Sequence, residues 1–314
     1  MITTTPVATA PVRIVSLLPG ATEIVCALGL GDALVGVSHE CDWPPAVREL
    51  SALTRAAIPP GLPPGETDRL VRERVARGEG LYTLDAALLA RLAPTLIVTQ
   101  ALCDVCSIAL PDVLRAARSL PTMPQVLSLE PGTLNEIFTD IRRVAVAADV
   151  PERADVLLAS LAARLAAVRA AVVGRPRPRV VLLEWLDPPF IAGHWGPEMI
   201  AAAGGEDALG VVGERSRSLP WEAVRAAQPN VIVVAPCGYD EARARAELDS
   251  ISLPAWWSDL AAVRAGRVVV LDGNAHVSRP GPRIVDGIEH LAHCLHREAF
   301  AIANFPVSAV AVVR

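Results

Sequence analysis

Three cysteines and a histidine carry the side chains best suited to metal or thiol chemistry. Cys103 and Cys106 form a C-x-x-C pair, while His39 and Cys41 follow a different apolar segment. Thiolate and imidazole groups from two neighbouring strand ends could complete a tetrahedral metal site. A single C-x-x-C pair is also compatible with redox chemistry or with incidental buried thiols. The sequence therefore leaves three alternatives open: a metal site at Cys103, Cys106 and Cys41, a redox pair, and incidental thiols.

A second group of residues is suited to holding a large, flat or partly apolar ligand. Only 4% of the chain is aromatic, yet several of its aromatic residues follow segments predicted to be strands. Ligands of α/β proteins bind beyond the carboxyl ends of the strands, and aromatic walls grip flat ligands. Packing between lobes is the alternative for any single ring. The predicted ligand contacts are Trp43, His39, Trp185, Phe190, His194, Trp195, Tyr239, His276 and Arg279.

Other motifs point away from familiar enzymes. The chain has no G-x-S-x-G elbow, Walker loop or H-E-x-x-H motif. Gly29 and Gly31 resemble the start of a dinucleotide fingerprint, but Leu34 stands where the third glycine belongs. His290, His293 and His296 lie on one predicted helix face, which we interpret as solvated surface. We therefore expect a protein that is not an enzyme.

Strand and helix patterns alternate along the chain and predict parallel sheets flanked by helices. Predicted strands cover residues 12–18, 34–37, 96–99, 125–129, 180–184, 231–235 and 267–271. Predicted helices cover residues 23–28, capped by Thr22, and 86–92, 111–120, 151–173, 197–203, 221–227 and 284–295. The fold class is therefore α/β, with two lobes joined by one long helix and a ligand cleft between the lobes.

The predicted domain limits follow this pattern. We expect a flexible N-terminus at 1–11, an N-terminal lobe at 12–150, a linking helix at 151–174, a C-terminal lobe at 175–298 and a tail at 299–314. Residues 59–80 form an insertion with a charged, helical second part. This insertion is either a solvated surface helix or a lid over a site.

Charge and hydropathy limit the partners. The chain has 314 residues and a formal net charge of -5, and all 29 of its basic residues are arginine. It lacks the basic footprint of a nucleic-acid-binding protein and any polybasic membrane patch. Mean hydropathy is +0.38, but no apolar run approaches the roughly 20 residues that span a bilayer. We expect a monomer that binds neither nucleic acid nor membrane.

The first residues, MITTTP, lack the basic and apolar regions of a secretory signal. The chain as written is therefore expected in the cytoplasm. If a signal was removed, the expected location is the periplasm or the cell surface.

Several motifs together resemble a known family. Residues 13–23 read RIVSLLPGATE, residues 35–38 read VGVS, residues 42–45 read DWPP and residues 278–283 read SRPGPR. In this order they resemble the substrate-binding proteins of cobalamin and iron-siderophore ABC importers, which have the class III periplasmic-binding-protein fold. The similarity is greatest to the cobalamin-binding branch and covers nearly the whole chain.

The resemblance implies two Rossmann-like lobes bridged by a rigid helix, with limited hinge motion. It implies a non-catalytic protein that has no intrinsic cofactor, holds a corrinoid in the cleft and has an ABC permease as partner. Trp43 and Phe190 match aromatic residues that flank the corrin. Glu222 matches a carboxylate of the second lobe that docks onto the permease, and Asp85 lies near the position of its counterpart in the first lobe. The insertion at 59–80, the loss of a tryptophan near Thr54, and the residues His39, Cys41, Cys103 and Cys106 depart from the family pattern.

Two alternative functions stay open. A ferric siderophore or haem would favour Arg215, Arg217 and Arg279 around an anionic chelate. A metal- or thiol-dependent enzyme would use Cys41, Cys103 and Cys106. For a corrinoid, His39, His194 or His276 could supply an axial imidazole to the cobalt.

Overall fold

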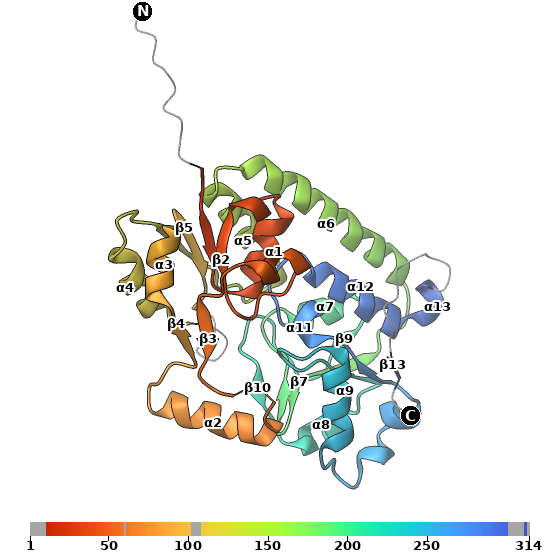
Figure 1. Ribbon diagram of the computed structural model, residues 1–314. Coiled ribbons are helices and arrows are strands. Elements are labelled where there is room, and N and C mark those ends of the chain that lie inside the picture. Colours follow the sequence, from red (N-terminus) through yellow and green to blue (C-terminus); the bar gives the residue numbers. More distant parts are fainter. Residues whose placement is uncertain (1–10, 60, 102–107, 301–310, 313–314) are drawn as a thin grey trace, which may run out of the picture.

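Figure 1 shows the computed structural model, which describes residues 11–59, 61–101, 108–300 and 311–312. The first half of the chain builds a sheet of four parallel strands in the order β2-β1-β5-β6. The central strands β1 and β5 are buried on both faces, as parallel sheets covered by helices require. The strands are Ile14–Ser16 (β1), Leu34–Val37 (β2), Leu96–Thr99 (β5) and Gln125–Ser128 (β6).

Four helices and two short 3-10 turns accompany this sheet. The helices are Pro19–Ala27 (α1), Ala86–Leu92 (α3), Leu110–Arg118 (α4) and Leu134–Ala147 (α5). The 3-10 turns are Gly31–Ala33 (η1) and Pro45–Glu49 (η2). A separate antiparallel pair, Thr54–Ala56 (β3) and Tyr82–Leu84 (β4), carries the helix Pro64–Ala76 (α2) between its strands.

One long helix, Pro151–Val172 (α6), leads from the first half to the second and lies along one side of both (Figure 1). Pro151 occupies the first turn, where the missing N–H leaves no hydrogen bond unmade. Ala154, Leu161 and Val168 are the buried residues of this helix, and their spacing places them on one face.

The second half builds a larger sheet in the order β10-β8-β7-β11-β12-β13, with β9 also paired to β7. Its parallel centre consists of Arg179–Leu186 (β7), Val231–Val234 (β11) and Val268–Val270 (β12). The shorter strands are Pro189–Ile191 (β8), Glu206–Asp207 (β9), Arg217–Ser218 (β10) and Ala311–Val312 (β13). Of these, β9 runs parallel to β7, and β8, β10 and β13 pair antiparallel.

Helices cover both faces of this second sheet as well. They are Gly196–Ala202 (α7), Trp221–Ala227 (α8), Glu241–Ser250 (α9), Ala261–Arg264 (α10), Gly273–His276 (α11), Ile284–Leu295 (α12) and Arg297–Phe300 (α13), with the 3-10 turn Trp257–Asp259 (η3). In the described part of the chain, no helix has both the length and the apolar character that a membrane crossing needs.

A single hydrophobic core runs through both halves. It joins residues of the first sheet, such as Ile14, to Leu161 of α6 and to Leu182 of the second sheet. The opposite faces of the two sheets have their own smaller clusters. The α/β fold class predicted from the sequence, with two halves joined by a long helix, is confirmed. The first sheet is parallel as predicted, and the second adds antiparallel strands to its parallel centre.

Several elements have the predicted limits, among them β2, α3, β5, α8 and α12. The helix predicted from residue 23 begins earlier, at Pro19, and Leu18 rather than Thr22 is its N-cap. Proline at the first helical position presets the backbone angle that starts the helix. Thr22 lies inside the first turns, and its hydroxyl donates to Ser16 Oγ at 2.8 Å.

The domain limits proposed from the sequence stay a prediction. The expected flexible N-terminus at 1–11 lies, apart from residue 11, outside the described residues. Within the expected tail at 299–314, β13 pairs with β12.

The insertion at 59–80 contains α2, in which the residues with described burial, 65–76, are all half-buried or exposed. Ion pairs such as Arg69 with Glu73, at 2.5 Å, join side chains on its surface. In Figure 1 this helix lies at the lower left, and one of its ends reaches the second half near β10 and β7. Its N-terminal end lies against the other half, because a Cβ added at Gly65 would stand 3.0 Å from Asp187 Oδ2. The helix is thus solvated along its length and in contact with the second half at one end.

Candidate functional site

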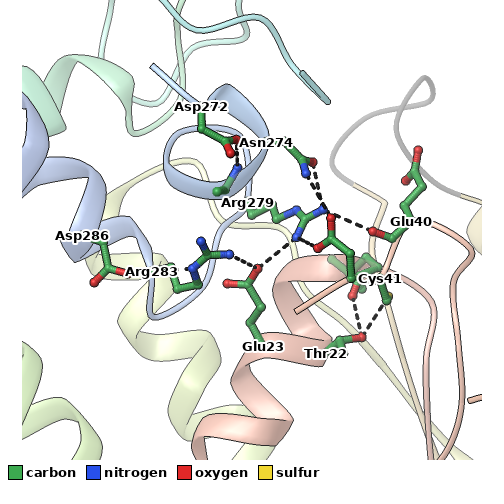
Figure 2. Close-up of polar contacts among 12 residues, drawn as sticks. Thr22, Glu23, Glu40, Cys41, Asp272, Asn274, Arg279, Arg283 and Asp286 are labelled. Carbon is green, nitrogen blue, oxygen red and sulfur yellow. Dashed lines mark hydrogen bonds and ion pairs between the residues drawn. The ribbon is translucent and has the colours of Figure 1, made fainter. Parts of the chain in front are cut away.

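A buried polar contact joins the two halves. Arg279 is 6% exposed, and its Nη1 donates to Asp42 Oδ1 at 2.5 Å and to Glu23 Oε1 at 3.2 Å. Its Nη2 donates to Asn274 Oδ1 at 2.9 Å and to the Glu40 carbonyl oxygen at 3.2 Å. Figure 2 shows these groups converging from α1, the loop after β2, and the segment around α11. We call Glu23, Asp42, Asn274, Arg279 and Arg283 the Arg279 seam.

The seam forms because two motifs approach closely. Gly20 begins the first turn of α1, and Pro280 belongs to the segment that contains Arg279. A Cβ at Gly20 would lie 2.8 Å from the Pro280 carbonyl oxygen, closer than real Cβ contacts. The absence of a side chain at Gly20 therefore lets the two backbones meet and brings Arg279 within reach of Glu23.

Burial and charge act against each other in this seam. Burial raises the pKa of Glu23 to about 7, although Arg283 and Arg279 oppose the rise. Burial also acts to raise the pKa of Asp42, but the hydrogen bond and the charge of Arg279 outweigh it and the pKa is lowered. The Asp42–Arg279 pair is therefore ionised at neutral pH. Glu23 Oε2 is buried and has no hydrogen-bond partner.

Trp43 follows Asp42 directly and is 45% exposed, which is unusual for the largest apolar side chain. The guanidinium of Arg283 lies over its ring, 4.6 Å from the centroid. An exposed ring supported from one side can stack against a flat ligand. The structure thus places Trp43 at the edge of the Arg279 seam.

His39 lies in the same loop and is exposed. Its Nδ1 is 2.7 Å from Thr54 Oγ1, and its ring is 5.5 Å from that of Tyr82. The Tyr82 hydroxyl donates to Glu40 Oε1 at 2.9 Å. A hydrogen bond on Nδ1 fixes the orientation of an imidazole whose other nitrogen meets a metal. Thr54 and Tyr82 were not singled out from the sequence, because they belong to the β3–β4 pair that the sequence did not predict.

Three of the predicted aromatic contacts gather in the second half. Trp185 and Phe190 are partners in the β7–β8 register, which places their side chains on the same face of the sheet. Trp185 also meets Tyr239 edge to face, with ring centroids 5.3 Å apart. Tyr239 is only 4% exposed and lies under the guanidinium of Arg243. Trp185 and Phe190 are half-buried and remain accessible.

The other predicted contacts are more enclosed. Trp195 is 6% exposed, and its Nε1 donates to the Val277 carbonyl oxygen at 2.8 Å. His194 has a positive φ of 47°, and its Nε2 is buried without a hydrogen-bond partner. Burial and the charge of Arg215 lower the pKa of His194. We interpret Trp195 as a packing residue.

His276 packs its ring edge to face against His290, with centroids 4.6 Å apart. Burial, followed by His290 and Arg283, lowers the pKa of His276 to about 4. This imidazole is therefore neutral in the folded protein at neutral pH.

Replacement of His276 by glutamine is expected to reduce the loss of stability in acid. Below pH 6.5 a histidine binds a proton in the unfolded chain, whereas the folded state keeps His276 neutral until about pH 4. His276 therefore lowers the free energy of unfolding progressively between pH 6.5 and 4, by at most about 3 kcal/mol. Urea titrations of wild type and His276→Gln across this range measure the difference, and parallel stability curves would contradict the prediction.

The cysteine cluster predicted from the sequence is only partly described. Cys103 and Cys106 lie outside the described residues. Cys41 is 5% exposed, its Sγ is 3.0 Å from Thr22 Oγ1, and burial raises its pKa to about 12. A buried thiol with this pKa is protonated at neutral pH and is a poor nucleophile. Among the described residues, no group of three His, Cys, Asp or Glu side chains could hold a metal ion.

The two carboxylates predicted to dock onto a permease both lie at exposed helix N-termini. Asp85 is the N-cap of α3, and its Oδ1 accepts from the Leu88 N–H at 2.8 Å. Glu222 lies in the first turn of α8. A cavity of about 240 Å³ opens beside Asp85, lined by Ala52, Leu53, Arg55, Thr83, Leu84 and Asp85. Its volume is below the roughly 300–1,000 Å³ of small-molecule sites, so we do not assign the ligand to it.

A second contact also joins the two halves. Glu198 of α7 accepts a hydrogen bond at 2.7 Å from the Leu134 N–H, at the start of α5. A carboxylate at this position satisfies a free N–H and complements the helix dipole. Each half of the chain is an α/β unit, and the two units are joined by α6 and by these contacts. This is the class III periplasmic-binding-protein fold.

Comparison with known proteins agrees with this class. Residues 14–275 match the family described as "Periplasmic binding protein", and the chain belongs to that family. It is 27% identical over 282 residues to a vitamin B12-binding protein of Vibrio cholerae, covering 89% of this chain and 87% of the relative. It is 25% identical over 301 residues to an uncharacterized ABC transporter substrate-binding lipoprotein of Bacillus subtilis, and the match covers 92% of this chain and 82% of the relative.

Solved structures include two with informative titles. A periplasmic heme-binding protein from Roseiflexus, in apo form, is 28% identical with a TM-score of 0.68, covering 92% of this chain and all of that one. The structure of the periplasmic vitamin B12-binding protein of Vibrio cholerae matches with a TM-score of 0.66 at 24% identity. The match covers 91% of this chain and 97% of that one. The resemblance stated from the sequence is confirmed, and the relatives are named as ligand-binding proteins or as a substrate-binding lipoprotein of an ABC transporter.

Proposed function

We propose that this chain binds a cobalt corrinoid, without chemistry of its own, and delivers it to an ABC permease. The observation that carries the proposal is Trp43, a half-exposed ring in the connection between β2 and η2 that lies against the guanidinium of Arg283. An indole in this position offers a corrin an apolar, polarisable face. The name of the Vibrio cholerae relative, which aligns over 89% of this chain, supports the same ligand.

Calorimetric titration of the purified protein with cyanocobalamin and with aquocobalamin tests the proposal. Saturable one-to-one binding is the expected result. No heat with either corrinoid would overturn it.

A ferric chelate, with haem as the main example, is the second candidate. The Roseiflexus structure is named as a heme-binding protein and is 28% identical. His39 suits an iron ligand, because its Nδ1 is held by Thr54 and its ring is exposed. Haem titration followed in the Soret band separates the two candidates. A sharp Soret shift that His39→Ala removes, together with no heat from corrinoids, would favour haem.

We propose that Asp85 and Glu222 form the permease-docking pair. The double variant Asp85→Asn, Glu222→Gln removes both charges, and asparagine still serves as an N-cap for α3. Uptake of radiolabelled cobalamin through the reconstituted permease is expected to fall roughly tenfold or more, since truncating one partner of a charge pair that is buried in an interface costs about 2–5 kcal/mol. The Kd for cobalamin should stay unchanged. Unaltered uptake would remove these residues from the docking surface.

The compartment is part of the same proposal. A receptor that supplies a permease works outside the cytoplasmic membrane, as the family description and the lipoprotein relative suggest. Immunoblotting of native cell fractions tests this. Recovery from the cytoplasm alone would replace delivery by storage or trafficking of the corrinoid.

A further inference from the structure

Trp43 needs external support to keep its ring in one orientation. It lies in the short connection between β2 and η2, outside any helix or strand. Almost half of its surface is exposed, so core packing does not fix it. A side chain in such a place samples several rotamers unless another group holds it. Ordering a mobile side chain when the ligand binds costs free energy and weakens the affinity.

Arg283 has the position to supply that support. It is the N-cap residue of α12, in the half of the molecule opposite to Trp43. Its guanidinium stands 4.6 Å from the Trp43 centroid, within the range of a cation–π contact. The planar guanidinium can stack flat on an indole, which an ammonium cannot do equally well.

Arg283 is itself held on two sides. Nη1 lies 3.4 Å from Glu23 Oε1, and Nε lies 3.8 Å from Asp286 Oδ2. Its side chain is only 19% exposed, and Asp286 is further fixed by Arg164 of α6 at 2.6 Å. The guanidinium of Arg283 is therefore held between Glu23 of α1 and Asp286 of α12.

We propose that Arg283 is a positioning residue that holds Trp43 as a preformed platform for the flat ligand. The platform then depends on both halves, since the ring comes from the first and its support from the second. If the two halves moved apart, the Trp43 ring would lose its contact with Arg283, and the affinity for the ligand would fall at the same time. This inference rests on the proposed function for the ligand, but the ring–guanidinium contact can be tested without any ligand.

The ligand-free test follows the emission of Trp43. The spectrum of wild type minus that of Trp43→Phe isolates this residue, and the same difference is taken in the Arg283→Met background. We expect Arg283→Met to raise the acrylamide quenching constant of Trp43 at least about twofold, because the ring loses its cover. Arg283→Lys, which keeps the charge, is expected to fall between the two. Equal quenching of Trp43 in wild type and Arg283→Met would overturn the proposal.

The chain offers a matched control. Arg225 lies over Trp256, with its Cζ 5.3 Å from the ring centroid, and Trp256 packs against a core cluster of the second half that contains no residue of the Arg279 seam. Arg225→Met removes a guanidinium from a tryptophan and should leave the Trp43 difference spectrum unchanged. If Arg225→Met raised the quenching of Trp43 as much as Arg283→Met does, the effect would be a general loosening, and the proposal would fail.

A double-mutant cycle with cyanocobalamin tests the link to binding. Arg283→Met is expected to weaken the Kd about three- to tenfold, the range of one cation–π contact. In the Trp43→Leu background the same substitution should have no further effect, because its target is gone. An undiminished effect in that background would mean that Arg283 contacts the ligand directly, and would overturn the positioning role. If cyanocobalamin fails to bind the wild type, the proposed function falls, while the quenching test still decides the role of Arg283.

Discussion

Replacing Arg279 with leucine is expected to lower the free energy of unfolding by about 3–5 kcal/mol, the usual effect of breaking a buried ion pair by removing one partner. The side chains of Arg279 and Glu23 are 6% and 2% exposed, so water cannot replace the lost cation. Glu23 would keep only Arg283, at 3.4 Å, and Asp42 would keep only weaker contacts such as Asn274 at 3.3 Å. Chemical denaturation of wild type and Arg279→Leu measures the difference.

Two comparisons make this result specific. Arg115→Leu removes an exposed pair with Asp112, whose side chains are 76% and 46% exposed, and should cost less than about 1 kcal/mol. Acid should also reduce the destabilisation of Arg279→Leu. A buried carboxylate without its cation has a raised pKa, so protonation of Glu23 and Asp42 removes the cost as the pH falls. A loss no larger than that of Arg115→Leu would show that the seam does not stabilise the fold.

Replacing Trp43 with alanine is expected to weaken cyanocobalamin binding about 10- to 100-fold, which corresponds to about 1.4–2.7 kcal/mol. The indole is the large exposed ring next to the Arg279 seam, and its removal takes away most of the apolar surface offered there. The melting temperature should change little, because the ring is 45% exposed and is not part of any core cluster. Calorimetry and thermal unfolding of the same samples separate binding from stability.

Two further variants test whether the effect is specific to an aromatic side chain at position 43. Trp43→Phe keeps an aromatic face and should lose far less affinity than alanine. Trp256→Ala removes another arginine-stacked tryptophan and should leave the Kd unchanged. Wild-type affinity in Trp43→Ala would remove the residue on which the corrinoid proposal depends.

The periodic part of the fold was predictable from the sequence. The apolar run Val231–Val234 and the amphipathic stretch Ile284–Leu295 show in their own residues which side chains are buried. The type and the limits of these elements therefore follow from the pattern of apolar residues. Short or polar elements do not carry such a signal. The strands β3 and β4 have three residues each, and β3 contains Arg55. Their pairing depends on tertiary contacts that no local pattern records.

The helix α5 is a different case, because its signal was present in the sequence and unused. Thr133 and Glu136 form a capping box, in which each side chain accepts a hydrogen bond from the backbone of the other. The spacing T-x-x-E before an apolar stretch would have predicted the start of this helix. The additional bond from Leu134 to Glu198 could not be foreseen, since it joins residues 64 positions apart.

The site was predictable in part. Strand ends pointed to the loop that carries His39 and Trp43, and the SRPGPR motif contained both arginines of the seam. The sequence could not assign different tasks to Arg279, which is enclosed by acceptors, and Arg283, which covers a ring. It also placed Trp195 and Tyr239 with the accessible rings, although both are buried, because a position after a strand does not determine exposure.

The Arg279 seam has a consequence for the synthesis of the chain. Glu23 and Arg279 are separated by 256 residues, so the carboxylate leaves the ribosome long before its cation. At roughly 5–20 residues per second, the delay is about 10–50 seconds. During that time the first sheet can assemble only around a Glu23 that is protonated or still hydrated. The contact between Glu23 and Arg279 can therefore form only after the chain around α11 has been made.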